Sequence, residues 1–365
     1  MPDTIADVLI AGGGSGGHIA PALAIAENLQ DASIRAILAC SERAIDQRML
    51  ESAGVEYHTT PARPLRRGPV GAARFALGFA RAHRAVSLVL LNESIDAVVA
   101  TGGFVAAPAL RAARQRQLPT VLLNLDSPPG RANRLATRWA DVVLSSVDAG
   151  LAGESRVNIP LRTSVIATGT AAACRERLGL KSDLPTLLVT GASQGASTIN
   201  MLIPELAIRN PMAFHGWQVL HVAGDGHVTD VQRQWETTDV PHRVIAFQDP
   251  MGDAWGAAEL AVSRGGANTI AEIAANTVPS LVLPYPWHAD RHQWQNAAPL
   301  ERLGGIVIVE DRVDEEANIA GAGAELLSLM DDRPRRESMR AAMSEVVTPN
   351  GAAAVTAAVK ELLSL

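Results

Sequence analysis

The feature that most constrains this chain is a pattern that occurs twice: a short apolar run, a glycine-rich loop and then a helical stretch. The first copy has its apolar run at 6–11 and its helical periodicity at 20–30, and the second has them at 186–190 and 196–208. Short apolar runs that alternate with helical patterns are typical of βαβ units and a parallel sheet. The sequence therefore predicts two successive α/β halves.

Further apolar runs continue the alternation in both halves. They lie at 34–39, 97–100, 120–123 and 142–144 in the first half, and at 219–223, 244–247, 260–262, 281–283 and 306–309 in the second. We place the joint near 163–169, and we predict a final helix over 351–363 with no strand after it. A chain of 365 residues suits two domains of moderate size.

The composition narrows the classes of protein to which the chain can belong. With 47% hydrophobic and 19% charged residues it is typical of a soluble globular protein, and its net charge of -6 argues against a general nucleic-acid binder. The two cysteines, Cys40 and Cys174, make no disulfide framework and fit a reducing compartment. Residues 1–7 carry no basic segment and no run of about 18 apolar residues occurs, so we expect neither a signal peptide nor a membrane span.

The stretch from 63 to 91 is unusually basic for so acidic a chain. Phe75, Leu77 and Phe79 alternate there with arginines and a histidine. A basic amphipathic surface suits anionic lipid headgroups, so we expect a membrane-surface contact made by Arg66, Arg67, Arg74, Phe75 and Phe79. The alternative is a solvated helix whose apolar side packs inward.

The first glycine loop runs from Gly12 to His18 and has the sequence GGGSGGH. Glycines allow close approach to a ligand, and the helix N-terminus behind them favours negative charge. A P-loop needs a lysine where His18 stands, which argues against an NTPase. The dinucleotide fingerprint G-x-G-x-x-G fits, but Glu42 is the nearest acidic residue and does not clearly end the next strand. A tight turn with no ligand is the third interpretation.

A second loop, from Gly191 to Gly195, offers backbone N–H groups, the Ser193 hydroxyl and the Gln194 amide. It is a second candidate for a phosphate cradle. Because such loops occur in two consecutive α/β halves, we expect a ligand in the crevice between them.

The segment from Ser263 to Glu272 ends a strand in two glycines and begins a helix with small polar residues. The Glu272 carboxylate, in the first turns of that helix, could accept two hydrogen bonds from a ribose diol. The alternative is that Glu272 only complements the helix N-terminus. Residues 284–297 form a polar, aromatic loop that leads into a helix and carries many groups able to bond sugar hydroxyls.

A metal site remains open as an interpretation of His288, Asp290 and His292, although they match no familiar set of ligands. No Asp-x-Asp ends an apolar run, so no motif indicates a metal that holds a diphosphate. We therefore expect no metal and no cofactor, and a leaving diphosphate neutralised by backbone N–H groups and helix ends.

These motifs, in this order, resemble those of the MurG family of glycosyltransferases, within glycosyltransferase family 28, over nearly the whole chain. Residues 13–23 are similar to the family's GGTGGH-xxPAL loop and 102–105 to its GGY/F-V turn. Residues 191–196 match its GGSQGA loop, 264–274 its RSGA-xx-xxEIA segment, and 290–297 are similar to its DxQxxNA helix.

The resemblance implies a GT-B fold with two Rossmann-like domains and a last helix that crosses back to the first. Residues 1–165 with 348–365 would bind the acceptor and the membrane, and 166–347 would bind the UDP-sugar. It implies inverting, metal-independent transfer of N-acetylglucosamine from UDP-N-acetylglucosamine to the undecaprenyl-linked muramyl-pentapeptide precursor of peptidoglycan. The resemblance further implies that the protein is peripheral, lies at the cytoplasmic face of the cell membrane, and serves cell-wall synthesis and cell division.

The resemblance also assigns roles to individual residues. Ser193 and Gln194 would approach the diphosphate or the sugar, and Glu272 would take the ribose hydroxyls. His292 and Gln293 would face the donor sugar, and the backbone near Phe247 and Gln248 would face the uracil. The donor site would be completed by Ser15, Gly16, Gly17, Gly195, Ala267 and Asn268, and the acceptor site would comprise Gly13, Gly14, Gly102, Gly103 and Asn133.

The chain departs from the family pattern at three places. The family's HEQN stretch reads LNLD at 123–126, its GNPVR motif reads GTAAA at 169–173, and its first donor-sugar glutamine is His292. Three alternatives therefore stay open: a GT-B transferase with a different lipid or small-molecule acceptor, a UDP-N-acetylglucosamine 2-epimerase, and a non-catalytic protein that binds UDP-sugar. A soluble epimerase has no need of the basic stretch.

An inverting transfer needs a base for the acceptor hydroxyl. His18 is the first candidate, because it stands where the first glycine loop meets a helix whose N-terminus should keep the ring neutral. Asp126 is its rival, because it follows the apolar run 120–123 on the same side of the predicted sheet. The alternative for His18 is a structural role in bonding loop carbonyls.

Overall fold

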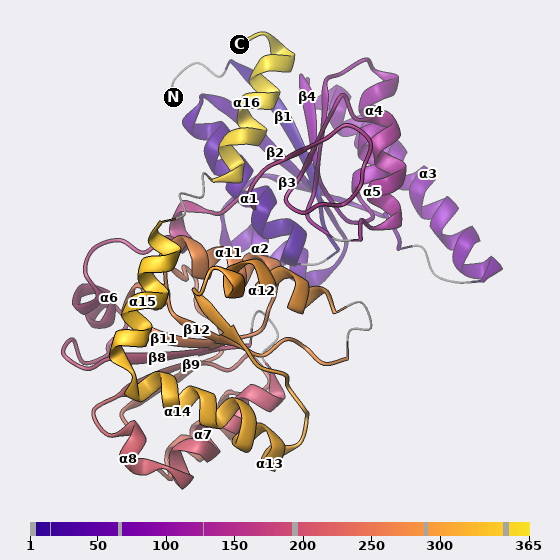
Figure 1. Cartoon of the computed structure of the whole chain (residues 1–365). Helices are drawn as coiled ribbons and strands as arrows, with labels where there is room; N and C mark the ends of the chain where they lie inside the picture. The colour runs from indigo at the N-terminus through magenta and orange to yellow at the C-terminus, as the bar shows by residue number, and fades with distance from the viewer. Residues whose placement is uncertain are drawn as a thin grey trace. The chain divides into compact units, whose positions relative to one another are not determined.

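The computed structural model of this chain describes residues 5–14, 16–64, 68–126, 128–191, 196–287, 291–345 and 350–365. The chain forms two compact units, one of Met1–Thr163 with Pro349–Leu365 and the other of Ser164–Thr348. Each unit contains a parallel β-sheet flanked by helices (Figure 1). The expected α/β class is therefore confirmed.

The first unit has a seven-stranded sheet in the order β3-β2-β1-β4-β5-β6-β7. Its strands are β1 (Ala6–Gly12), β2 (Ile34–Ser41), β3 (Tyr57–Thr60), β4 (Ala97–Gly102), β5 (Thr120–Asn124), β6 (Val142–Ser145) and β7 (Glu154–Arg156). Its helices are α1 (Gly16–Asp31), α2 (Ala44–Ser52), α3 (Pro69–Asn92), α4 (Ala106–Gln115), α5 (Arg131–Ala136) and α16 (Gly351–Leu363), with a 3-10 turn at Thr137–Trp139. The edge strands β3 and β7 were not predicted, because their sequences YHTT and ESR contain no apolar run.

Successive residues of the central strand β1 are buried on opposite faces of this sheet. Val8 and Ile10 join an apolar cluster with residues of α1 and α16, whereas Leu9 and Ala11 join one with residues of α3 and α4. The central strands of a parallel sheet covered on both faces carry apolar residues at nearly every position. This is why the strands appear in the sequence as continuous apolar runs.

Helix α16 is tied to the first unit through Asn350 and Gly351. The Asn350 Oδ1 caps the helix by accepting from the Ala352 N–H at 3.0 Å, and it also accepts from the Leu161 N–H at 3.0 Å. A Cβ on Gly351 would collide with the carbonyl oxygen of Asn158. The predicted final helix therefore packs against the unit that the chain left at residue 163.

The second unit has a six-stranded sheet in the order β10-β9-β8-β11-β12-β13. Its strands are β8 (Thr186–Thr190), β9 (Gln218–Val222), β10 (His242–Ile245), β11 (Ala258–Ser263), β12 (Ser280–Val282) and β13 (Ile306–Ile308). Its helices are α6 (Ala171–Arg177), α7 (Ser197–Arg209), α8 (Pro211–Phe214), α9 (Val228–Trp235), α10 (Gly252–Ala257), α11 (Ala267–Asn276), α12 (His292–Arg302), α13 (Glu315–Asn318), α14 (Ala324–Asp331) and α15 (Arg333–Ser344), with a π-helical segment at Ile319–Gly323. Strand β10 begins two residues before the predicted run 244–247 and ends two residues before the end of that run.

The core of the second unit follows the same rule as the first. Leu187 and Val189 of β8 pack with α7 and α14, while Leu188 between them packs with α10 and α11. Among the described helices, including the 24-residue α3, none has the length and apolarity that a membrane-spanning helix requires.

Candidate active site

Two glycine turns meet at the carboxyl end of the first sheet, one after β1 and one after β4. Gly14 (φ +97°) and Gly103 (φ +73°) have backbone conformations that other residues rarely adopt. A Cβ on Gly103 would collide with the carbonyl oxygen of Gly13, and a Cβ on Gly14 would collide with the Phe104 ring. The structure therefore brings together the two turns that the family resemblance assigned to the acceptor.

His18 lies in the first turn of α1, next to both glycine turns. Its Nδ1 is 3.1 Å from the carbonyl oxygen of Thr101. Because a carbonyl can only accept a hydrogen bond, the neutral ring carries its proton on Nδ1 and keeps a free lone pair on Nε2. That Nε2 lies 3.9 Å from Asp126 Oδ2. The two rival bases are therefore neighbours, with the histidine 13% and the aspartate 49% exposed.

A directed chain of hydrogen bonds orients Asn133 beside these turns. Ser145 Oγ donates to the Val147 carbonyl at 2.7 Å, and Asn124 Nδ2 donates both to Ser145 Oγ at 3.1 Å and to the Asp126 carbonyl at 2.9 Å. Asn124 Oδ1 then accepts from Asn133 Nδ2 at 2.9 Å. Asn133 is 1% exposed, and its Oδ1 has no hydrogen-bond partner among the described residues. A buried acceptor without a donor is costly, so this oxygen is a place where a ligand can add a bond.

Two residues that the sequence analysis did not identify fix the first glycine turn. Asp46 of α2 is fully buried, and its Oδ2 accepts from the Gly14 N–H at 2.7 Å and from Ser41 Oγ at 2.6 Å. Arg43 donates to the Gly14 carbonyl, and its guanidinium lies 5.3 Å from the centre of the Phe104 ring. Side chains therefore hold both backbone groups of Gly14. The only indication in the sequence was that Asp46, an acidic residue, lies on the buried face of a short helix.

A cavity of about 330 Å³ borders this group of residues. Three residues expected in the site, Gly103, Asp126 and Asn133, contribute to its wall. The rest of the wall comes from α3, α5 and the adjoining loops: Pro64, Phe75, Phe104, Gly130, Arg131, Ala132 and Leu135. The first unit thus offers a pocket that combines apolar, acidic and basic side chains.

In the second unit, Glu272 lies in the second turn of α11 and is held by α10. Trp255 Nε1 donates to Glu272 Oε2 at 2.9 Å. Burial raises the pKa of Glu272 to about 7, although the hydrogen bond from Trp255 acts in the opposite direction. The other carboxylate oxygen has no hydrogen-bond partner among the described residues, so it can accept from a ligand hydroxyl.

The start of α12 packs against the glycine turn that precedes α11. A Cβ on Gly265 would collide with the carbonyl oxygen of Gln293, and Asn296 Nδ2 donates to the Gly265 carbonyl at 3.1 Å. Gln293 Oε1 accepts from the Tyr285 N–H at 2.8 Å. The Nε2 group of Gln293 is therefore the part of its amide that can serve a ligand.

A buried ion pair connects three loops at the same edge of the second sheet. Arg264 and Asp311 are 5% and 2% exposed, and Arg264 Nη1 lies 2.7 Å from Asp311 Oδ2. Arg264 Nη2 donates to Thr198 Oγ1 at 2.7 Å. Burial pushes the pKa of Asp311 upward, but hydrogen bonds from Thr198, Asn318, the Val313 N–H and Arg264 outweigh it and hold the pKa below its usual value. Asp311 was not predicted, because it lies 47 residues from Arg264 in the sequence.

The remaining expected donor residues lie at the starts of helices or in loops. Gly16 and Gly17 begin α1, Ala267 and Asn268 begin α11, and His292 begins α12. Phe247 is 56% exposed in the loop after β10, where Gln248 Nε2 donates to the Pro250 carbonyl at 3.0 Å. Several expected residues lie outside the described residues, and the roles given to them stay predictions: Ser15, Arg66, Arg67, Ser193, Gln194, Gly195, His288 and Asp290.

The expected membrane-surface residues divide between the two sides of α3. Arg74 is exposed, whereas Phe79 packs against Trp139 at a ring distance of 6.3 Å and lies under Arg111. Phe75 contacts Phe79 at 6.1 Å. The apolar side chains most open to solvent on the first half of the helix are Val70 and Leu77, 64% and 52% exposed. The beginning of α3 projects beyond the rest of the first unit (Figure 1).

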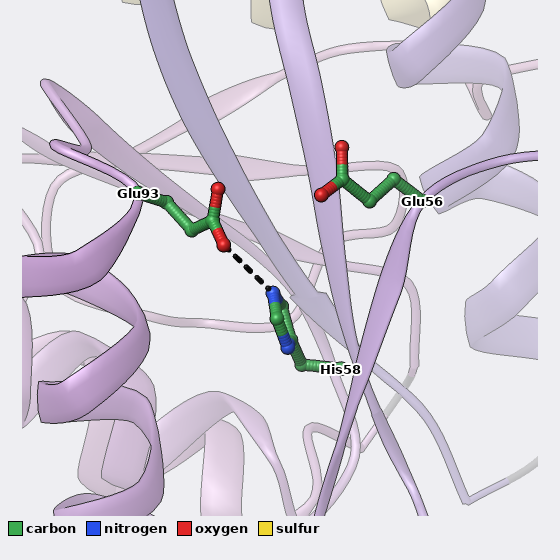
Figure 2. A group of neighbouring side chains, drawn as sticks. All are labelled: Glu56, His58 and Glu93. Atoms are coloured by element: carbon green, nitrogen blue, oxygen red, sulfur yellow. Dashed lines mark ion pairs between the residues drawn. The ribbon is translucent and has the colours of Figure 1, made fainter.

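One group of side chains has the composition of a metal site. Ligand atoms of Glu56, His58 and Glu93 lie within 4.8 Å of one another, and His58 Nε2 is 3.5 Å from Glu93 Oε1 (Figure 2). However, Arg35 Nη2 already pairs with Glu56 at 2.8 Å and with Glu93 at 3.2 Å. The Arg35 guanidinium therefore already supplies the positive charge that a metal ion would bring to these carboxylates, and we assign no metal here.

Comparison with known proteins gives matches over both units. Residues 8–145 match the glycosyltransferase family 28 N-terminal domain, and residues 186–353 match its C-terminal domain. A curated relative from Leifsonia xyli subsp. xyli is 36% identical over 365 residues, which cover 98% of each chain. Its name is UDP-N-acetylglucosamine--N-acetylmuramyl-(pentapeptide) pyrophosphoryl-undecaprenol N-acetylglucosamine transferase. A relative of the same name from Streptomyces coelicolor is 36% identical over 311 residues, covering 83% of this chain and 84% of that one.

Solved structures show that the fold is shared more widely than the sequence. The crystal structure of MurG from Acinetobacter baumannii matches with a TM-score of 0.73 and 23% identity, covering 97% of this chain and 99% of that one. The UDP-GlcNAc 2-epimerase from Neisseria meningitidis, bound to UDP-GlcNAc, matches with a TM-score of 0.62 and 14% identity, covering 98% and 99%. At these identities the likeness establishes the GT-B type of fold.

The contacts of Asp46 generate a prediction about stability. Asp46→Ala should lower the free energy of unfolding by about 1–3 kcal/mol, because the Gly14 N–H and the Ser41 hydroxyl lose their buried acceptor. Asp46→Asn should recover part of the loss, since an amide oxygen can still accept from Gly14. Urea unfolding measures both, with Gln47→Ala on the same helix as a control that should stay within about 0.5 kcal/mol of the parent. Equal losses in Asp46→Ala and Gln47→Ala would contradict the assignment.

Proposed function

The chain belongs to glycosyltransferase family 28, and we propose that it transfers N-acetylglucosamine from UDP-N-acetylglucosamine to N-acetylmuramyl-(pentapeptide) pyrophosphoryl-undecaprenol. This is the reaction named by relatives 33–36% identical over most of their length. The reaction builds the lipid-linked disaccharide precursor of peptidoglycan. The observation that supports the proposal for this chain is the pair of His18 and Asp126. This pair lies beside the two glycine turns, next to a pocket that is large enough for part of a substrate.

In the reaction, the acceptor hydroxyl oxygen attacks the anomeric carbon of the donor sugar as the bond from that carbon to UDP breaks. The hydroxyl proton has to be removed during this attack. His18 Nε2 is suited to take it, because the Thr101 carbonyl holds the ring with its free lone pair on that side. Asp126, whose Oδ2 lies 3.9 Å from that nitrogen, can accept a hydrogen bond from the acceptor and so hold it beside His18. UDP leaves with the electron pair and needs its negative charge stabilised.

The second unit supplies groups suited to the donor. Glu272 presents one carboxylate oxygen that Trp255 does not occupy, and this oxygen can accept from the ribose hydroxyls. The beginning of α11, which follows the Gly265–Gly266 turn, directs backbone N–H groups toward an anion. Backbone groups and helix ends would then stabilise the leaving diphosphate, and the proposed reaction needs no metal.

Helix α3 is suited to hold the protein at an anionic membrane surface. Val70 and Leu77 are exposed apolar side chains on its projecting first half, and Arg74 stands between them in the sequence. An apolar face flanked by basic residues binds the headgroup region of anionic bilayers. We place the protein as a peripheral protein on the cytoplasmic side, where the nucleotide sugar is made.

The roles of His18 and Asp126 can be separated by kinetics. His18→Ala should lower kcat by roughly 10²–10⁴ while UDP affinity stays unchanged. Asp126→Asn should act mainly on the KM for the acceptor. The measurement is the initial rate with labelled UDP-N-acetylglucosamine and the lipid-linked muramyl-peptide, with UDP affinity taken from calorimetry.

The reverse pattern would identify Asp126 as the base, and unchanged rates in both variants would exclude both residues. EDTA should leave the rate intact. Conversion of UDP-N-acetylglucosamine without any acceptor would instead indicate an epimerase.

Glu272 should make UDP binding depend on pH. Glu272→Ala should weaken UDP binding by about 1.5–3 kcal/mol through loss of a charge-assisted hydrogen bond. Because its pKa is raised to about 7, the carboxylate loses its charge as the pH falls below 7. UDP should therefore bind about tenfold more weakly at pH 6 than at pH 8.

Glu272→Gln keeps the acceptor for Trp255 but cannot titrate, so its UDP affinity should change less over the same range. Calorimetry at both pH values provides the test. If the parent and Glu272→Gln show the same pH dependence, Glu272 does not contact the nucleotide.

Exposed apolar side chains on α3 should determine membrane binding. The parent should float with vesicles that contain anionic lipid, and Val70→Ser/Leu77→Ser should float markedly less at low salt. Leu91→Ser, at the other end of the same helix and 59% exposed, is the matched control and should behave like the parent. Equal flotation of all three proteins would show that the first half of α3 does not contact the bilayer.

A further inference from the structure

The buried ion pair of Arg264 and Asp311 joins segments that are far apart in the sequence. Arg264 Nη1 lies 2.7 Å from Asp311 Oδ2 and donates to the Leu283 carbonyl at 2.9 Å. Arg264 Nη2 donates to Thr198 Oγ1 at 2.7 Å, and the same hydroxyl donates to Asp311 Oδ2. Both terminal nitrogens of the guanidinium are therefore bonded to the protein. Arg264 is suited to hold loops in place and not to bind a substrate phosphate.

Asp311 is itself held through its second oxygen. Its Oδ1 accepts from the Val313 N–H at 2.9 Å and from Asn318 Nδ2 at 3.0 Å. Its side chain is fully buried, and both of its oxygens are bonded. The carboxylate is therefore fixed in place, and it determines where the Arg264 guanidinium lies.

The segments that Arg264 holds are the ones that contact Gln293. Arg264 is followed by Gly265, where a Cβ would collide with the Gln293 carbonyl oxygen. Arg264 Nη1 lies 3.4 Å from the Pro284 carbonyl oxygen, and the guanidinium carbon lies 5.6 Å from the centre of the Tyr285 ring. The Tyr285 N–H in turn donates to Gln293 Oε1 at 2.8 Å. The backbone and the side chain of Gln293 are thus each in contact with a segment that Arg264 holds.

The contact with Tyr285 fixes which way the Gln293 amide faces. An N–H group can only donate, so the amide offers its oxygen to Tyr285 and keeps its NH₂ group for a ligand. Gln293 therefore presents a hydrogen-bond donor, which suits a hydroxyl or carbonyl oxygen of an amino sugar. If the segment at Tyr285 moved, the amide could rotate and present either group.

We propose that Asp311 and Arg264 are positioning residues for the donor sugar, because they hold the segments that orient the Gln293 amide. The inference rests on the proposed function and on the expectation that Gln293 faces the sugar. The nucleotide half of the donor is assigned to Glu272, which Trp255 holds through a separate hydrogen bond. Loss of the ion pair should therefore weaken recognition of the sugar and spare recognition of the nucleotide.

Ligand affinity separates positioning from a general loss of structure. Asp311→Asn keeps the shape of the side chain but removes the charge that holds the guanidinium. We expect it to weaken UDP-N-acetylglucosamine binding about tenfold and to leave UDP binding within about twofold of the parent, as measured by calorimetry on the full chain. Glu310→Gln, which changes the neighbouring exposed acid, is the matched control and should change neither affinity.

Thr198→Val provides a second variant that keeps both members of the ion pair. It removes only the hydroxyl between Arg264 and Asp311, so it tests the network even if Asp311→Asn folds poorly. We expect the same selective loss of UDP-N-acetylglucosamine affinity, about threefold. In a Gln293→Ala background, where no amide is left to position, either change should weaken UDP-N-acetylglucosamine binding by less than about twofold more.

The inference is overturned if these variants weaken UDP and UDP-N-acetylglucosamine equally, if neither weakens UDP-N-acetylglucosamine binding, or if their effects persist in full in the Gln293→Ala background. Transfer by the parent together with any of these results would overturn the inference alone. A sugar-selective loss that requires Gln293, in a parent that binds the donor but transfers no sugar, would overturn the proposed function alone.

Discussion

The close approach of two glycine turns determines the arrangement of the first unit's site. Strands β1 and β4 are neighbours in a parallel sheet, so their carboxyl ends open onto the same edge and the turns after them touch. The Gly13 carbonyl fills the space where a side chain on Gly103 would stand. A Cβ on Gly102 would stand 3.0 Å from the His18 ring, so glycine at this position lets the ring lie over both turns without a shift. The orientation of the proposed base is therefore a consequence of strand order.

In the second unit, the edge that we propose binds the donor is stabilised differently, by buried charge. Arg264 and Asp311 join the loops after β11 and β13, and Thr198 at the beginning of α7 bonds to both. Breaking such a pair would leave an uncompensated charge in the protein interior, which is strongly unfavourable. These loops are thus held in place by contacts within the protein itself. Glu272 lies outside this network, because its partner Trp255 is neutral, and burial raises its pKa to about 7.

Local patterns in the sequence predicted the central strands of both sheets, the final helix and the first glycine turn, because strand and helix periodicity is a property of adjacent residues. The turn after β4 was identified through the family resemblance. Local patterns did not predict the contacts that fix those turns. Asp46 reaches Gly14 from 32 residues away, and Arg264 meets Asp311 from 47. Such pairs depend on which strands become neighbours, and no local pattern contains that information. The proximity of His18 and Asp126 was easier to predict, because both residues were placed at the carboxyl edge of one sheet.

The return of α16 to the first unit has a consequence for synthesis on the ribosome. Val355 and Val359 complete the apolar layer on one face of the seven-stranded sheet, and Asn350 joins the returning chain to Leu161. The second unit, Ser164–Thr348, is continuous and can be completed while translation proceeds. The first unit begins earlier, yet the face of its core that α1 covers in part is not complete until α16 has been made. The half of the protein that is translated first is therefore the half that finishes folding last.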